Sequence, residues 1–206
     1  PPPPPPALVG AHPFRRGREG AHPGGARMVG ADLFLARMEG ADLRGARMEG
    51  ADLSEARMEG ANLRGAVFDY SLMWYAAATS ARISGATFVG AGLMRADVAD
   101  PLDLDPAAFA DALSAAFGDG SVALPDGVTR PDHWPDDSLT EAAFLSRWRG
   151  WREASGLPWP PPGLALSRRV LGRERPHDLP DIPATPPRPP RRHRGDRRLT
   201  PAAPRT

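Results

Sequence analysis

A five-residue period dominates the first half of the chain. From Ala26 to Asp100 the sequence divides into fifteen consecutive units, the first of which read ARMVG, ADLFL, ARMEG and ADLRG. Ala opens fourteen units and Ser71 opens the other; the third residue is large and apolar in every unit except the one that holds Ala78. A period of five matches neither the 3.6-residue period of a helix nor the two-residue period of a strand. It predicts a chain that turns a corner every five residues, with one small and one large side chain directed inward from each side.

This pattern resembles the pentapeptide-repeat family, whose signature is A(D/N)LXX, as in ADLFL, ADLRG, ADLSE and ANLRG. The resemblance implies an all-β solenoid: a right-handed quadrilateral β-helix with four repeats per coil and about four coils, stacked about 4.8 Å apart. The stretch from Phe117 to Trp151 resembles the C-terminal extension of some alphaproteobacterial members, so a bacterial member with such an extension is expected.

A register of twenty residues per coil arranges the third positions in four interior columns. Phe68 and Phe88 then lie one above the other, as stacked rings would. The predicted structural core is Met28, Leu33, Met38, Leu43, Met48, Leu53, Met58, Leu63, Phe68, Met73, Ala78, Ile83, Phe88, Leu93 and Val98.

Several apolar residues fall at outward positions of the repeats and toward the same side of the solenoid. Clustered exposed apolar side chains usually mark an interface, so these residues form a candidate interaction surface. The alternative is that the chain's own Trp-rich C-terminal segment covers this side, and the sequence leaves both readings open. The residues are Phe34, Leu35, Tyr70, Leu72, Trp74, Tyr75 and Met94.

The period stops after Asp100, and residues 101–157 are expected to form a helical C-terminal cap, since the end of a solenoid needs a cover. Asp105 and Pro106 read as an N-cap and first helical residue. Phe109, Leu113 and Phe117 then follow at helical spacing up to Gly118. Ser138 with Glu141 reads as a capping box that opens a second helix closed near Gly156.

The two ends of the chain are rich in Pro. Residues 1–25 are interpreted as a Pro-rich leader with decayed repeats. Residues 158–206 are interpreted as a Pro/Arg-rich, largely disordered tail, because they hold few large apolar side chains. Residues 168–206 contain eleven Arg and four acidic residues. Weak contact of this basic tail with nucleic acid or anionic lipid is therefore a further hypothesis.

The sequence points to no catalytic chemistry. It has no Cys, no nucleophile motif and no phosphate-binding loop, so neither an enzyme, a cofactor, a metal nor a small-molecule substrate is expected. The expected function is a non-catalytic protein–protein interaction or scaffolding module, with an unknown protein partner or self-association. A cytoplasmic location is expected, with a membrane tether if a further segment precedes this sequence.

Two alternative functions are weaker. Some family members mimic DNA and modulate a type II topoisomerase, which needs a strongly acidic rod. Residues 26–100 hold ten acids and eight Arg, so their surface is only slightly acidic. The other alternative is the soluble part of a membrane-tethered repeat protein, although no run of about 18 apolar residues is present.

Overall fold

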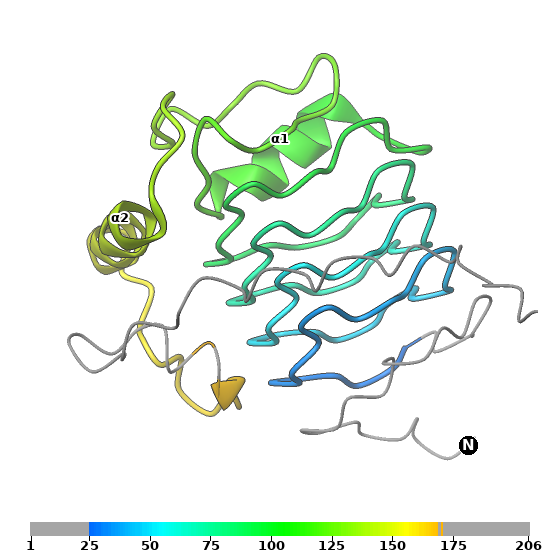
Figure 1. Cartoon of the computed structure of the whole chain (residues 1–206), viewed down its shortest axis with the longest axis horizontal. Coiled ribbons are helices and arrows are strands. Elements are labelled where there is room, and N and C mark those ends of the chain that lie inside the picture. The colour runs from blue at the N-terminus through cyan, green and yellow to red at the C-terminus, as the bar shows by residue number, and fades with distance from the viewer. Residues whose placement is uncertain (1–24, 169, 171–206) are drawn as a thin grey trace, which may run out of the picture. The chain divides into compact units, whose positions relative to one another are not determined.

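The computed structural model describes residues 25–168 and residue 170, all within one unit of the chain, Pro1–Arg175 (Figure 1). The leader, the decayed repeats up to Gly24, and the tail from Leu171 onward lie outside the described residues.

The predicted register of twenty residues per coil is confirmed. From Arg27 to Ala77, the second residue of each five-residue unit forms a parallel bridge with the residue twenty positions later, as Arg27 does with Arg47 and Arg47 with Val67. Three more series of bridges start at Asp32, Arg37 and Asp42. The bridges are isolated, because the chain turns after each one, and the described residues contain no longer strand. A solenoid is thus present, and the right-handed winding stays a prediction.

Backbone hydrogen bonds explain why the coils stack. The N–H of Met28 donates to the carbonyl of Arg47 at 2.7 Å, and the N–H of Arg47 donates back to the carbonyl of Ala26 at 2.8 Å. Within a coil, the N–H of Ala31 donates to the carbonyl of Met28 at 3.1 Å and closes the corner. Repetition of this pattern satisfies the main-chain groups of the coils, which would otherwise be buried at considerable cost.

The solenoid interior holds the predicted core. All fifteen predicted residues are buried, none more than 3% exposed. The rings of Phe68 and Phe88 are stacked, with their centroids 5.3 Å apart and their planes 8° apart. The Ala residues that open the units are buried at the corners, where nothing larger is needed to fill the space.

The top of the solenoid is closed by helix α1, Pro106–Ser114, with Asp105 as its N-cap. Phe109 and Leu113 are buried, and the Phe109 ring meets the Phe88 ring edge-on. The prediction for Phe117 was wrong in one respect. The helix ends at Ser114, and Phe117 instead forms a bridge with Gly92, so the chain after α1 adds part of a further coil.

Helix α2, Glu141–Ala154, begins three residues after the predicted cap position. Its N-cap is Thr140, whose hydroxyl accepts from the N–H of Ala143, so the predicted capping box at Ser138 is wrong. Phe144 and Trp148 on α2 are buried. Gly156 follows the helix in the left-handed region, as expected for a helix end.

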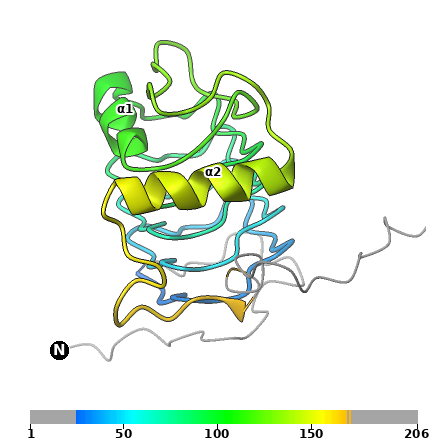
Figure 2. The same cartoon turned by 90° about the vertical axis from the view of Figure 1, so that its left-hand side faces the viewer.

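After α2 the chain continues as an ordered segment, which we call the strap: residues 157–168 together with Val170. The tail that the sequence predicts to be largely disordered, residues 158–206, begins with this segment, and from Leu171 onward it lies outside the described residues. The Trp159 ring lies 5.9 Å from the Trp148 ring, and the N–H of Ser167 donates to the carbonyl of Gly50 at 2.9 Å. Figure 2 shows α2 crossing one side of the coils and the strap running along that side toward the first coils.

Candidate functional site

The structure divides the predicted interaction surface into a covered part and an exposed part. Leu72, Trp74 and Met94 are at most 1% exposed, so the prediction that they are exposed is wrong. Their side chains do leave the coil outward, but α2 and the strap pack on them. We call the resulting group the outer cluster: Leu72, Trp74, Met94, Phe117, Phe144, Trp148 and Val170.

Aromatic contacts hold the outer cluster together. The Trp74 and Phe144 rings meet edge-on, with 5.7 Å between centroids, and the Phe117 and Phe144 rings are 5.2 Å apart. The indole N–H of Trp148 donates to the carbonyl of Gly90 at 3.1 Å. The chain's own C-terminal segment therefore covers this side, which was the alternative that the sequence left open.

Tyr70 and Phe34 are half-buried. The Tyr70 ring lies 6.5 Å from the Trp159 ring of the strap. Burial raises the pKa of the Tyr70 hydroxyl, and the negative charge of Asp69 adds to this, while Arg152 opposes it. Tyr70 thus borders the covered side.

The exposed part of the predicted surface is a corner of the solenoid, which we call the corner column: Leu35, Glu55, Tyr75 and Arg95. Leu35 is 52% exposed and Tyr75 is 40% exposed. Arg95 donates to the Tyr75 hydroxyl at 3.1 Å, and its guanidinium lies 5.3 Å from the centre of the Tyr75 ring. Four stacked coils therefore present four large side chains along one edge.

The backbone of the corner column is strained. All four residues lie in the left-handed region, with φ between 54° and 59°. That region costs an L-residue about 1–2 kcal/mol, whereas Gly enters it without penalty. Every other corner has Gly in at least two coils. Sequence reasoning missed Glu55 and Arg95, and the signal was available: the units ADLFL, ADLSE, SLMWY and AGLMR all lack a fifth-position Gly.

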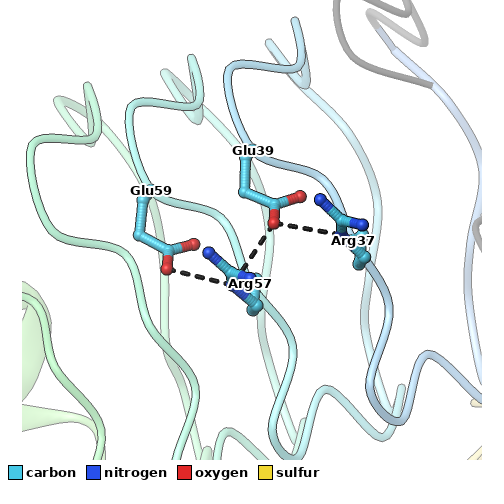
Figure 3. A network of polar contacts seen from close by, with 4 residues as sticks. All are labelled: Arg37, Glu39, Arg57 and Glu59. Carbon is cyan, nitrogen blue, oxygen red and sulfur yellow. Dashed lines mark hydrogen bonds and ion pairs between the residues drawn. The ribbon is translucent and has the colours of Figure 1, made fainter. Parts of the chain in front are cut away.

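Another side of the solenoid carries alternating charges. Glu39 lies 3.2 Å from both Arg37 and Arg57, and Arg57 lies 3.2 Å from Glu59 (Figure 3). Burial alone would raise the pKa of Glu39, but a backbone hydrogen bond and the two Arg side chains hold it below its usual value. Arg37 thus stacks on Arg57 in the next coil, and the neighbouring acids Glu39 and Glu59 compensate these like charges.

On the covered side, one acidic residue forms no ion pair of this kind with an Arg. Asp52 is fully buried, and one of its oxygens accepts from the N–H of Ser54 at 2.9 Å. Its other oxygen and the Ser54 hydroxyl are buried without a hydrogen-bond partner.

The described residues can be compared with the requirements of metal and small-molecule sites. They contain no group of three or more His, Asp or Glu placed to hold a metal ion. His133 lies 2.7 Å from the Ala116 carbonyl and is stacked on Trp151, so it packs within the cap. A pocket of about 100 Å³ between Ile83 and Phe109 is well below the volume of a ligand site.

Among the described helices, none has the length and apolar character to cross a bilayer.

The sequence similarity of this chain to a known family lies in its repeats. The family model for pentapeptide repeats matches residues 20–50 and 31–69, in eight copies. No curated protein matches the chain. Similar solved structures include HetL, a pentapeptide repeat protein involved in heterocyst differentiation regulation from the cyanobacterium Nostoc sp. strain PCC 7120. It shares 21% identity over 58% of this chain and 53% of HetL, with a TM-score of 0.37.

Two further structures are similar over shorter or weaker alignments. Full-length QnrB1, a plasmid-mediated fluoroquinolone resistance protein, shares 19% identity over 63% of this chain and 62% of its own, with a TM-score of 0.28. A pentapeptide repeat protein from the Arabidopsis thaliana thylakoid lumen shares 26% identity over 48% of this chain and 76% of its own, with a TM-score of 0.23.

The chain spans less than two thirds of the length of HetL and of QnrB1. The family model, however, matches the same five-residue unit that builds the coils. Residues 20–69 of this chain thus match the pentapeptide-repeat family in sequence.

Proposed function

We propose that this chain is a non-catalytic protein-interaction or scaffolding module, and that it contacts an as yet unidentified protein partner through the corner column. The observation that carries the proposal is the strained backbone of Leu35, Glu55, Tyr75 and Arg95. Stability alone favours Gly at these positions, because Gly adopts a positive φ freely. Strain that is retained in a rigid scaffold is typical of functional positions.

The chemistry of the corner column suits a protein partner. Leu35 and Tyr75 are two of the three large apolar side chains that are exposed among the described residues. Tyr and Arg are enriched among the residues that contribute most to protein interfaces. The contact between Arg95 and Tyr75 orders both side chains before binding, which reduces the entropy lost on association.

The alternative of DNA mimicry has no comparable observation in its favour. Arg37, Arg47 and Arg57 each pair with an acid two positions along the chain. The outward surface of these coils therefore alternates in charge. A gyrase supercoiling assay with micromolar protein checks this alternative, and we expect no inhibition.

A variant with Leu35→Gly and Tyr75→Gly tests the proposed function. Because Gly relieves the left-handed strain, the variant is expected to melt at the same temperature as the wild type or higher. Cross-linking of the full chain to its partner in cell extract, followed by mass spectrometry, is expected to fall at least tenfold.

The matched control is Ser80→Gly with Asp100→Gly. These residues also have a positive φ, at a different corner, so the control relieves comparable strain and should keep wild-type cross-linking. Equal recovery of the same partner by the corner-column variant and the wild type would show that the corner column does not bind it.

A further inference from the structure

We propose that the side of the solenoid beneath α2 and the strap is a second protein-binding surface, which the chain covers with its own C-terminal segment. The partner that we infer is a helical segment with an aromatic face and a basic side chain that reaches Asp52. This inference rests on the proposed function as a protein-binding module, but it uses no residue of the corner column.

Helix α2 and the strap, which together we call the cover, are separate from the solenoid core. The inner core consists of the residues inside the coils together with residues of α1 and the following loop, including Trp134; no residue of α2 or the strap belongs to it. The outer cluster is a distinct group. Removal of α2 and the strap would therefore leave the inner core closed.

The second step is the shape of the surface beneath the cover. Without α2, the outward side chains of Leu72, Trp74, Met94 and Phe117 would form one apolar face. A contiguous apolar face of this kind is typical of an interaction site. Trp is among the residues that most often dominate binding energy.

The third step is that α2 itself shows how a helix fits this surface. Phe144 and Trp148 are four residues apart, so both point from one side of the helix. Phe144 packs on Trp74, and the Trp148 ring packs so closely on Gly92 that a Cβ there would lie 3.2 Å from it. Aromatic anchors four residues apart are a common mode of helix recognition.

The fourth step concerns the charge under the strap. In the same coil, the acids Glu49 and Glu59 pair with Arg47 and Arg57. Asp52 is more deeply buried than either. Each of the three acids has one buried oxygen without a hydrogen-bond partner, but Asp52 forms no ion pair with an Arg among the described residues. Burial of a carboxylate without a compensating charge is costly. The cover is therefore weakened at this point, and a segment with a basic side chain there would bind better than the strap does.

The strap indicates where such a side chain would be placed. The N–H of Ser167 donates to the carbonyl of Gly50, two residues before Asp52. Because Ser167 lies beside Gly50, we expect a Lys side chain at its position to extend toward the Asp52 carboxylate. A peptide with the sequence of residues 139–170 and its Ser167→Lys variant thus form a matched pair of probes.

Hydrogen exchange of the full wild-type chain tests whether the cover opens. We expect the amides of α2 and of Ser167 to exchange at least tenfold faster than those of Met48 and Leu53 in the coils, because the cover opens without unfolding the coils. Asp52→Asn removes the buried charge and keeps the turn to Ser54, so it should slow exchange of the cover about tenfold.

Asp97→Asn is the matched control for Asp52→Asn. Asp97 makes the same turn, accepting from the N–H of Ala99 at 3.1 Å, on a side that the cover does not occupy. Exchange of the cover should be unchanged in this control. If the cover exchanges only as slowly as the coils do, it is a permanent part of the fold and the proposal is wrong.

Peptide binding tests the charge of the partner. The receptor is the full chain with Trp148→Ala, which weakens the cover in place. The 139–170 peptide should bind it, and the Ser167→Lys peptide should bind at least tenfold more tightly. Addition of Asp52→Asn to the receptor should abolish that gain. Absence of peptide binding, or a gain that survives Asp52→Asn, would overturn the proposal.

Failure of this inference is distinguishable from failure of the proposed function. A receptor that also carries Leu35→Gly and Tyr75→Gly should bind both peptides unchanged, since the corner column lies outside the outer cluster. Loss of partner cross-linking in that variant therefore reports on the corner column alone, and peptide binding reports on the covered surface alone.

Discussion

The carboxylate of Asp103 accepts a hydrogen bond from the N–H of Ile83 at 2.9 Å. One coil below, the corresponding N–H of Leu63 donates to a backbone carbonyl, that of Arg82. Asp103 lies where the chain leaves the solenoid, and its side chain replaces the backbone acceptor that a further coil would supply. It also accepts from the Ser84 hydroxyl and from Arg64. A side chain thus ends the ladder of hydrogen bonds on this side.

Asp103→Asn should destabilise the fold at neutral pH but not in acid. Burial alone would raise the pKa of Asp103, but hydrogen bonds from Ser84, Arg64 and Ile83 and the charge of Arg64 hold it below its usual value. A lowered folded-state pKa means that ionised Asp103 stabilises the fold at neutral pH, and that this contribution is lost as the pH falls through the folded-state pKa. We expect a loss of about 1–2 kcal/mol at pH 7, and a smaller difference near pH 3, from urea unfolding.

Asp105→Asn is the control for that measurement, because Asn caps a helix about as well as Asp does. It should leave the unfolding curve nearly unchanged. A difference between wild type and Asp103→Asn that is the same at both pH values would rule out a role for the charge.

Leu53→Arg should abolish folding. Leu53 is fully buried inside the second coil, and an Arg there would be a buried charge without a partner, a change that costs several kcal/mol. Leu35→Arg is the matched control, because Leu35 is 52% exposed. Circular dichroism and a melting curve check both; a cooperative wild-type transition for Leu53→Arg would contradict the register.

Gly50→Ala should cost more than Gly60→Ala. Both residues have a φ near 66°, so each substitution carries a penalty of about 1–2 kcal/mol. A Cβ at Gly60 meets nothing within 4 Å, whereas one at Gly50 would lie 2.7 Å from the Ala165 carbonyl oxygen of the strap. The difference between the two unfolding free energies therefore measures the docking of the strap. Equal losses would mean that the strap moves aside without cost.

The sequence was sufficient to predict the solenoid because every unit repeats the same local information. A small residue at each corner and a large one inside specify the register. A shift of the register by one residue would direct charged side chains into the core. Phe68 and Phe88 illustrate this: their spacing of twenty residues predicts the stacking that the rings show.

The covered surface could not be predicted in the same way. The period directs the Trp74 side chain outward, and that is correct, but the period says nothing of a segment seventy residues later that packs against it. Contact between Trp74 and Phe144 depends on the path of the chain from residue 115 to residue 140, which no repeat specifies. For the same reason the packing of the strap could not be predicted: its few apolar residues, such as Trp159 and Val170, pack on α2 and the coils rather than on one another.

Trp74→Ala should release α2 without unfolding the coils. Trp74 belongs to the outer cluster and not to the inner core, and replacement of a buried Trp by Ala costs about 3–5 kcal/mol where the site cannot collapse. The substitution should therefore weaken the packing of the cover on the coils. Hydrogen exchange is expected to rise across Glu141–Ala154 and at Ser167, while the coil amides stay protected. Light scattering on the same sample should show the oligomeric state of the wild type. Tyr75→Ala, at the adjacent exposed position, is the control and should leave α2 protected. Wild-type protection of α2 in the Trp74→Ala variant would show that this contact does not hold the cover in place.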